Sequence, residues 1–414
     1  MTKVLTAPAA RAASLDEWLA GGGGEGLRAA LAEPAAIIPL LQAAGLRGMG
    51  GAGFPAHIKW AAVAAETATQ KWIIANGNED EPGTFKDRFL LEHTPHPVIE
   101  GVLIAALATG AANAVIYANP RETTAIERLG RGIREWSRHP LFEAVSTAIG
   151  QPLALTVQAS SGLYVGGEET GAIAAVAGGF PFPRHKPPWP AQQGVHGCPT
   201  LVNNVETLAL APHVLRHGAD WFHRLGRTAP GTKLYSLSGD ILRPGLHELP
   251  MGTPLRELIH EHGGGMLAGE PFKAVFTGGP SNTLLTPNDL DVALDFDSLQ
   301  AHGSRLGTGA MIVVGEGTSI VRRTAEFVSF FAASSCGQCP PCKIGTYQVA
   351  RILERIEEGA GHPDDLQALE HLAGLLPGSG RCGLVDGAAT VLASSLTSFR
   401  AEYERAIAAG SPHT

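Results

Sequence analysis

Residues 334–343 read SSCGQCPPCK and place Cys336, Cys339 and Cys342 at two-residue spacing. A fourth cysteine, Cys382, follows in the segment GRCGL, residues 380–384. Three closely spaced thiolates with one distant thiolate are the usual ligand set of a cluster of four irons and four sulfides. The spacing therefore predicts a [4Fe-4S] cluster bound by these four cysteines.

Two other interpretations of the cysteines stay open at this point. Structural zinc sites more often use two CxxC pairs, one on each knuckle, than a run of three cysteines. Disulfides are disfavoured because the chain is predicted to be cytoplasmic, where thiols stay reduced.

The sequence around the cysteines predicts four helices, over residues 318–333, 343–358, 363–376 and 384–408. If these helices pack up and down, the first and third connections lie at the same end of the bundle. Those two connections carry all four cysteines, so a C-terminal four-helix bundle would bring the cluster ligands together.

Composition excludes several classes of protein. A net charge of −8 and a pI near 6.1 argue against nucleic acid as the main partner. No apolar run reaches the roughly 18–20 residues of a membrane helix, and the N-terminus lacks the pattern of a signal peptide. We expect a cytoplasmic protein of two or three domains with no direct membrane insertion.

A glycine-rich segment, residues 45–55, reads GLRGMGGAGFP and matches GxGxxG at Gly48, Gly50 and Gly53. A dinucleotide fingerprint needs a preceding strand, but residues 26–44 read as helix. A glycine turn that leads into a helix beginning with proline still offers backbone N–H groups to a phosphate. The alternative is a plain glycine-rich connector.

Beyond this loop, strands and helices alternate, which predicts a mostly parallel sheet with ligands at the carboxyl ends of its strands. The predicted strands are 72–75, 114–118 and 153–159, and the predicted helices are 97–109, 122–136 and 168–177.

Two loops follow strands of this sheet. Residues 76–83 read NGNEDEPG, and residues 161–170 read SGLYVGGEET. Both loops are therefore candidate ligand sites, and each has an ordinary alternative interpretation. The first would be a solvated turn, and the glutamates of the second would interact only with a helix dipole.

Residues 180–190 read FPFPRHKPPWP, and their prolines predict a stiff loop. The cations and the tryptophan of this loop suit an anionic, planar ligand, and the alternative is a structural connector. Residues 201–207, LVNNVET, are predicted to open a helix. Cys198 has no partner at metal spacing and is predicted to be a buried free thiol.

Residues 233–285 predict a compact β-grasp module that acts as a scaffold. We identify no catalytic histidine, serine triad or acid–base pair anywhere in the chain. Hydride and electron transfer need none, because cofactors can carry that chemistry.

Taken in order, these motifs resemble the family of NADH-oxidising flavoprotein (51 kDa-type) subunits of respiratory complex I, which also supplies the diaphorase (beta) subunits of NAD-linked formate dehydrogenases and hydrogenases. The resemblance covers residues 45 to 400 and implies FMN, NAD(H) and one [4Fe-4S] cluster. It implies an α/β fold with an N-terminal segment (1–44), a Rossmann-like FMN- and NADH-binding domain (45–228), a β-grasp (ubiquitin-like, SLBB-like) module (229–310) and a helical bundle with the cluster (311–414).

The resemblance also implies which residues bind the cofactors, with Glu81 and Glu169 near the nicotinamide and flavin. The implied cofactor-binding residues are Gly48, Gly50, Gly51, Phe54, Lys59, Asn76, Asn78, Glu79, Glu81, Tyr164, Gly167, Glu168, Glu169, Lys186, Trp189, Asn203, Asn204, Thr207 and Leu384.

Four positions depart from the pattern of the complex I members: Met49 replaces arginine, Asn78 aspartate, Gly166 cysteine and Trp189 phenylalanine. They favour a soluble NAD-dependent formate dehydrogenase over complex I or an NAD-reducing hydrogenase. The implied partners are a thioredoxin-like [2Fe-2S] subunit and a larger iron–sulfur/molybdenum or hydrogenase subunit. A conventional Rossmann dehydrogenase is the alternative from another class, and a colourless zinc-binding subunit is a third.

Overall fold

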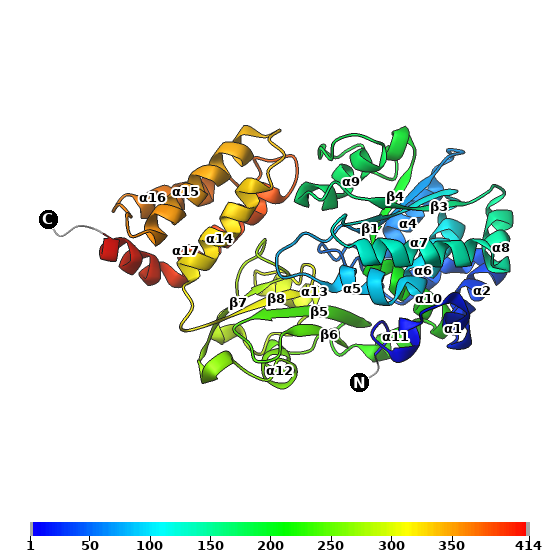
Figure 1. Ribbon diagram of the computed structural model, residues 1–414, viewed down its shortest axis with the longest axis horizontal. Helices are drawn as coiled ribbons and strands as arrows, with labels where there is room; N and C mark the ends of the chain where they lie inside the picture. The colour runs from blue at the N-terminus through cyan, green and yellow to red at the C-terminus, as the bar shows by residue number, and fades with distance from the viewer. Residues whose placement is uncertain (1–2, 411–414) are drawn as a thin grey trace. The chain divides into compact units, whose positions relative to one another are not determined.

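A computed structural model describes residues 3–410 of the chain (Figure 1). The chain forms two compact units, each made of more than one segment. The first comprises Met1–Asp80, Thr84–Tyr235 and Leu246–Thr253, and the second comprises Glu81–Gly83, Ser236–Gly245 and Pro254–Thr414.

The first unit is built on a parallel sheet with the strand order β3-β2-β1-β4. Its strands are β1 (Trp72–Gly77), β2 (Asn113–Ala118), β3 (Ala154–Ala159) and β4 (Thr200–Asn204). The predicted parallel sheet is confirmed. Because all four strands run the same way, their carboxyl ends meet at one edge.

The fourth strand corrects the sequence analysis, which placed a helix start over residues 201–207. Residues 200–204 instead pair with β1, and helix α10 (Val205–His217) begins one residue later. Leu201 and Val202 are buried, and the Asn204 side chain accepts a hydrogen bond from the Glu206 backbone N–H as the helix cap. The segment is therefore a strand followed directly by a capped helix.

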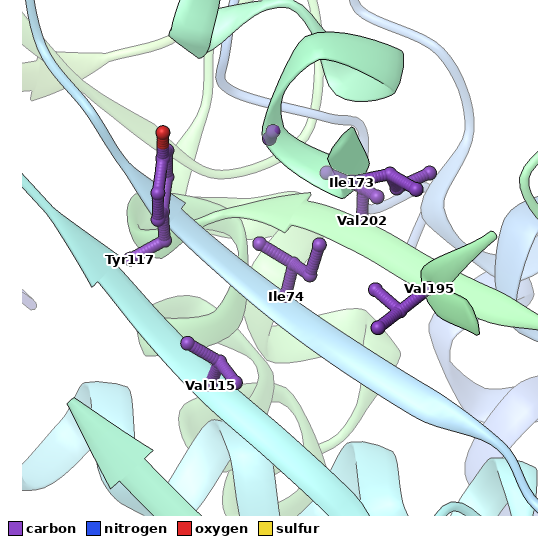
Figure 2. Packing of buried hydrophobic residues seen from close by; sticks show 7 residues of the cluster. Ile74, Val115, Tyr117, Ile173, Val195 and Val202 are labelled. Atoms are coloured by element: carbon purple, nitrogen blue, oxygen red, sulfur yellow. The ribbon is translucent and has the colours of Figure 1, made fainter. Parts of the chain in front are cut away.

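Both faces of strands β1, β2 and β4 are mostly buried, as expected when helices cover a parallel sheet on two sides, whereas the edge strand β3 is partly exposed. Ile74, Val115 and Val202 lie on one face and pack against Ile173 of α9 (Figure 2). Side chains alternate along a strand, so Ile73 projects to the opposite face, and it is fully buried there.

The described part of the first unit contains eleven α-helices. They are α1 (Leu15–Ala20), α2 (Glu25–Ala32), α3 (Ile37–Ala43), α4 (Ala56–Ala65), α5 (Lys86–His93), α6 (Pro95–Thr109), α7 (Thr123–Ser137), α8 (Pro140–Ile149), α9 (Glu169–Val176), α10 and α11 (Ala219–Leu225). Helix α6 is apolar on nearly every side and almost wholly buried. Its buried Glu100 accepts hydrogen bonds from Trp18 Nε1 and from the backbone N–H groups of Gly24 and Leu27, which ties α1 and α2 to the core.

A second sheet has the strand order β6-β5-β8-β7. Its strands are β5 (Thr232–Gly239), β6 (Gly245–Pro250), β7 (Phe272–Thr277) and β8 (Ala310–Gly315), with the short helices α12 (Leu255–Glu257) and α13 (Phe296–Ala301) nearby in sequence. Strands β5 and β8 are parallel, whereas β7 and β8 are antiparallel.

Four helices follow close to their predicted bounds: α14 (Ile320–Ala333), α15 (Thr346–Glu357), α16 (Asp365–Leu375) and α17 (Leu384–Gly410). Helix α14 packs against α15 and α17, and α16 packs against α17 (yellow to red in Figure 1). Among the described helices, none combines the length and hydropathy that crossing a bilayer requires.

Candidate functional site

The glycine-rich loop closes on itself between α3 and α4. The backbone N–H of Gly48 donates to the Phe54 carbonyl at 2.8 Å, and Arg47 Nε donates to the Gly53 carbonyl at 2.6 Å. The preceding element is helix α3, as predicted, so the usual strand of a dinucleotide fingerprint is absent here. Gly51 has φ +138°, and a Cβ added there would meet no atom within 4 Å, so the backbone is open to a ligand.

The loop is anchored to the edge where β4 meets α10. The Met49 N–H donates to Thr207 Oγ1 at 2.8 Å. A Cβ on Gly50 would lie 3.0 Å from Asn204 Cβ, so glycine permits this close approach. The loop therefore contacts two predicted site residues, Asn204 through Gly50 and Thr207 through the Met49 N–H.

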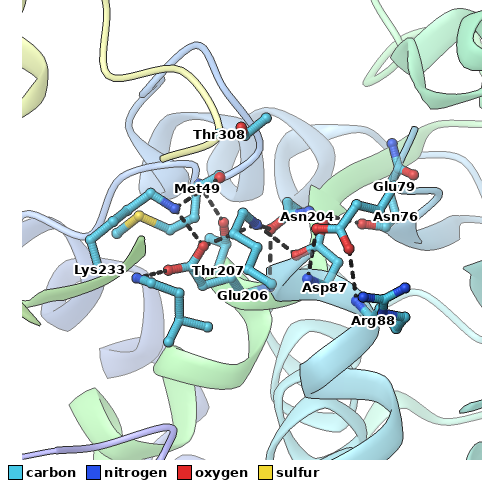
Figure 3. A network of polar contacts seen from close by, with 12 residues as sticks. Met49, Asn76, Glu79, Asp87, Arg88, Asn204, Glu206, Thr207, Lys233 and Thr308 are labelled. Atoms are coloured by element: carbon cyan, nitrogen blue, oxygen red, sulfur yellow. Dashed lines mark hydrogen bonds and ion pairs between the residues drawn. The ribbon is translucent and has the colours of Figure 1, made fainter. Parts of the chain in front are cut away.

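Under this loop lies a network of buried charges that the sequence analysis missed (Figure 3). Glu206 Oε2 lies 2.6 Å from Lys233 Nζ and 3.0 Å from Lys86 Nζ. Lys86 Nζ also lies 2.6 Å from Asp87 Oδ1 and donates to Asn204 Oδ1 at 2.9 Å. Lys86, Glu206 and Lys233 are fully buried, so each charge depends on its partners.

The partners shift the pKa values of these groups in different directions. Burial lowers the pKa of Lys233 to about 8, although the Glu206 carboxylate opposes the shift. Burial by itself would raise the pKa of Glu206, but the ammonium groups of Lys233 and Lys86 outweigh it and lower that pKa. Burial would also lower the pKa of Lys86, but Asp87 and Glu206 outweigh it and raise that pKa. Lys86 and Glu206 are thus stabilised in their charged forms, whereas burial makes the protonated form of Lys233 less favourable than in water.

No local sequence signal marks these residues. Lys86 and Asp87 open an ordinary helix and Lys233 opens a strand, positions at which charges usually face solvent. Only the fold brings them to Glu206, which is more than a hundred residues from Lys86 in the chain.

The acidic loop after β1 is ordered by hydrogen bonds and is not a solvated turn. Asn76 Nδ2 donates to the Gly167 carbonyl at 2.8 Å, which joins this loop to the loop after β3. Asn78 Nδ2 donates to the Leu163 carbonyl at 3.3 Å. Glu79 accepts from the backbone N–H groups of Asp87 and Arg88, at 2.8 and 3.1 Å.

The environment of Glu79 favours its neutral form. Burial, reinforced by the Asp87 carboxylate, raises the pKa of Glu79 to about 7, and the Lys86 ammonium only partly opposes this. The positive charges of Lys86 and Lys233 already balance the negative charges of Asp87 and Glu206. A proton on Glu79 therefore keeps the net charge of these five side chains at zero.

The two glutamates at the start of α9 behave differently. Glu168 caps the helix and accepts from the N–H groups of Thr170 and Gly171, which is the helix-terminus role weighed as an alternative. Glu169 instead lies between two lysines, 2.8 Å from Lys59 Nζ and 2.6 Å from Lys186 Nζ. Burial would raise the pKa of Glu169, but both lysines, Lys59 first, outweigh it and lower that pKa.

Aromatic side chains with exposed surface accompany these polar groups. Phe54 is 45% exposed and Trp189 is 52% exposed. Lys186 Nζ lies 5.7 Å from the centre of the Trp189 ring, while Tyr164 is half-buried in a short 3₁₀ turn. Exposed aromatic rings of this size suit stacking on a planar ligand.

The predicted cofactor-binding residues thus fall mostly in the first unit, where hydrogen bonds or close contacts join most of them. Two do not belong to it, because Glu81 and Leu384 are part of the second unit. The side-chain oxygen of Asn203 is engaged by Trp60 Nε1 at 2.8 Å, so this residue also secures α4 to β4.

In the second unit the two connections that carry the predicted cluster ligands come together. The Arg381 N–H, next to Cys382, donates to Cys339 Sγ at 3.4 Å. Gln338 Nε2 donates to Cys336 Sγ at 3.5 Å, and Ser335 Oγ lies 3.3 Å from Cys342 Sγ. Donors to ligand sulfurs suit an iron–sulfur site, because they stabilise its thiolates.

The cysteines differ in exposure. Cys342 is buried within a π-helical turn (Pro341–Gly345), and burial raises the pKa of its thiol. Cys198 is half-exposed, with its Sγ 3.9 Å from the His196 carbonyl, so its predicted burial is wrong. The turn at Gly197, with φ +79°, holds this segment at the surface ahead of β4.

Comparison with protein families identifies three regions of the chain. Residues 41–213 match the Nuo51 FMN-binding domain, residues 234–282 match the SLBB domain, and residues 322–406 match the NADH-ubiquinone oxidoreductase-F iron-sulfur binding region. The last match spans all four cysteines and describes an iron-sulfur binding region, which favours the cluster over the zinc alternative.

Similar proteins align with the chain over nearly its whole length. An NADH-quinone oxidoreductase F subunit of Rhizobium meliloti is 42% identical over 94% of this chain and 93% of its own length. The NADP-reducing hydrogenase subunit HndC of Solidesulfovibrio fructosivorans is 40% identical, over 94% of this chain and 80% of its own.

A crystal structure of an NAD⁺-reducing [NiFe]-hydrogenase in the H₂-reduced state aligns with a TM-score of 0.85 and 33% identity. The alignment covers 98% of this chain and 68% of that one. Together with the FMN-binding domain and the iron–sulfur region, these matches place the chain in the family of NADH-oxidising flavoprotein subunits that bind FMN and a [4Fe-4S] cluster, found in complex I and in NAD-reducing hydrogenases.

Proposed function

We propose that this chain exchanges hydride with NAD(H) and relays single electrons to partner subunits of a soluble NAD-dependent formate dehydrogenase. The observation that carries the chemistry is the presence of an FMN-binding domain and an iron–sulfur region on one polypeptide. Bound FMN would exchange electrons with NADH in pairs, and the cluster would carry them singly. This chain's own residues bind and orient the cofactors.

The phosphate of FMN would be held by the glycine-rich loop. Gly51 leaves backbone N–H groups open, and α4 begins just beyond the loop, so its N-terminal dipole favours an anion. Met49 brings no cation, but Lys233 Nζ lies 3.4 Å from the Met49 carbonyl beneath the loop. The loop therefore keeps a positive charge close by without the arginine that is usual in the family.

The flavin ring and the nucleotide would be oriented by polar groups at the carboxyl ends of the strands. Asn76, Asn78, Glu79, Tyr164, Gly167, Glu168, Asn203, Asn204 and Thr207 are proposed as flavin-site residues, with Leu384 nearby. Phe54, Lys186 and Trp189 would contact the nucleotide by stacking and charge, and Glu81 and Glu169 would face the nicotinamide. No side chain is assigned as a general acid or base, and catalysis depends on orientation.

We further propose that residues 229–310 form a β-grasp module and residues 311–414 a four-helix bundle, after an N-terminal segment (1–44) and the nucleotide-binding domain (45–228). Cys336, Cys339, Cys342 and Cys382 would hold the cluster. Lys343 and Arg381, adjacent in sequence to ligands, would offset its negative charge.

The parent complex has two candidates. The departures at Met49, Asn78, Gly166 and Trp189 favour a formate dehydrogenase, with a thioredoxin-like [2Fe-2S] subunit and a larger iron–sulfur/molybdenum subunit as partners in the cytoplasm. The similarity to complex I and hydrogenase subunits favours those assemblies instead.

Two experiments test the proposal. The purified chain should reduce ferricyanide with NADH, lose that activity when flavin is removed and regain it with FMN; a flavin-free preparation that stays active would refute the chemistry. Mass spectrometry of the intact complex from its host then separates the candidates. A molybdenum-containing partner and formate-dependent NAD⁺ reduction support formate dehydrogenase, whereas a nickel–iron partner or membrane subunits refute it.

A further inference from the structure

Three residues of the acidic loop belong to the second unit, although the rest of that loop belongs to the first. Glu81, Pro82 and Gly83 are grouped with strands β7 and β8 and with residues 236–239 of β5. Gly83, with φ +80°, lies against β8, since a Cβ there would be 2.6 Å from Ile312 Cγ1. The second sheet thus provides the surface on which this part of the loop rests.

The Glu81 side chain fills the space beside one residue of that module, Gly279. Gly279 is buried, has φ +95°, and follows β7. A Cβ on Gly279 would lie 2.4 Å from Glu81 Cγ, 2.5 Å from Oε1 and 2.9 Å from Cδ, and these are its three nearest neighbours. The side chain of Glu81 therefore occupies space that exists only because position 279 is glycine.

The loop around Gly279 has little freedom to retreat. A Cβ on Gly278 would lie 2.6 Å from Gly307 Cα, so the two backbones are in contact. Thr308 Oγ1 donates to the Gly278 carbonyl at 3.2 Å, and buried Asn282 donates through Nδ2 to the Thr277 carbonyl at 2.9 Å. Where packing is this close, an added methyl group must displace neighbouring atoms, because there is no empty space for it to fill.

We propose that Gly279 is a positioning residue that sets the place of the Glu81 carboxylate for the nicotinamide. This inference rests on the proposed function, in which Glu81 faces the nicotinamide. The module that matches the SLBB domain then does more than scaffold the chain, because it determines the geometry of one nucleotide-site side chain.

The test compares NAD⁺ with ADP-ribose, which lacks the nicotinamide, as ligands of the oxidised, FMN-loaded protein in calorimetric titrations. Gly279→Ala should weaken NAD⁺ binding roughly tenfold, the order expected for one misplaced hydrogen-bonding group, and leave ADP-ribose binding unchanged. Gly303→Ala is the matched control, since Gly303 also has positive φ (+72°) but no atom within 4 Å of an added Cβ. It should change neither affinity.

A double-mutant cycle shows whether the effect passes through Glu81. In a Glu81→Ala background, which clears the space that the new methyl group needs, Gly279→Ala should change NAD⁺ affinity less than twofold. Should Gly279→Ala fail to fold, Thr308→Val removes the hydroxyl that donates to the Gly278 carbonyl and accepts from the Ala310 N–H, without adding bulk. It should give a two- to threefold loss for NAD⁺ alone.

The outcomes separate the two proposals. Wild-type protein that binds neither ligand would refute the proposed function itself. The role of Gly279 would be overturned if the wild-type protein binds both ligands but the variants weaken both affinities equally or change neither. It would also be overturned if Gly279→Ala has the same effect on NAD⁺ affinity in the Glu81→Ala background as in the wild type.

Discussion

One carboxylate, that of Glu206, organises the charges beneath the glycine-rich loop. Its Oε2 contacts the ammonium groups of Lys233 and Lys86, and its Oε1 accepts from the Leu234 N–H at 2.9 Å. A buried carboxylate is tolerated only when it is paired and hydrogen-bonded in this way. The network is thus stable as a set and sensitive to the loss of any one member.

Removing one of these ammonium groups should therefore be costly. Lys233→Met is expected to lower the free energy of unfolding by about 3 kcal/mol, because it leaves Glu206 with a single cation in a dry site. Urea unfolding followed by circular dichroism measures the change. Arg256→Met is the control, since Arg256 pairs with Asp291 at the exposed surface and should leave the unfolding midpoint unchanged. Equal midpoints for both variants would contradict the buried-network argument.

Glu79 makes stability depend on pH in a defined direction. Its pKa is about 7 in the folded chain and 4.5 as the ordinary value, so the folded state holds the proton more tightly. Its stabilising contribution is complete below pH 4.5 and is lost as the pH rises to about 7.

The variant Glu79→Gln cannot titrate at this position. The difference in free energy of unfolding, wild type minus Glu79→Gln, should therefore fall between pH 4.5 and 7 and stay level above that. Thermal unfolding at a series of pH values measures it. A difference that is constant or rises over this range would contradict the raised pKa.

At the scale of elements, the turn between α3 and α4 works through its backbone. Gly51→Ala should reduce FMN affinity roughly tenfold, because φ +138° strains any L-residue and the methyl group would enter the open space over the loop. Flavin retained after gel filtration measures the loss. Gly110→Ala, at another positive-φ glycine with an unobstructed Cβ, controls for backbone strain and should keep its flavin.

The connection between α16 and α17 contributes one predicted ligand to the cluster. Cys382→Ser should abolish most bound iron, because three thiolates remain for four irons, while bound flavin stays near its wild-type level. Metal analysis and flavin absorbance of protein purified without oxygen measure the two quantities. Cys198→Ser should retain full iron content, and full iron in Cys382→Ser would refute the ligand assignment.

At the scale of the whole molecule, the two cofactor regions fall mainly in different compact units. The FMN-binding match lies in the first unit apart from residues 81–83, and the iron–sulfur match lies in the second. Loss of one cofactor should therefore not unfold the site of the other.

This separation can be measured as activity. Cys382→Ser should keep at least about half of the wild-type NADH–ferricyanide activity, since flavin alone can reduce ferricyanide, but should lose electron transfer to the native partner subunits. Parallel loss of both activities, with flavin still bound, would contradict functional separation of the two regions.

The cofactors and most of the secondary structure were predictable from the amino-acid sequence. The cysteine spacing identified the cluster region, and the alternating pattern predicted the parallel sheet, because ligand spacing and hydrophobic periodicity are local properties. The prediction failed at β4, where a short apolar run before a capped helix reads equally well as the helix itself.

Which distant residues share a site could be seen only once the chain was folded. Folding brought Lys86, Glu206 and Lys233 together beneath the glycine-rich loop, and it placed Gly279 against Glu81. The physical reason is that burial, pKa shifts and close backbone approach depend on neighbours far apart in the chain, which no local pattern records.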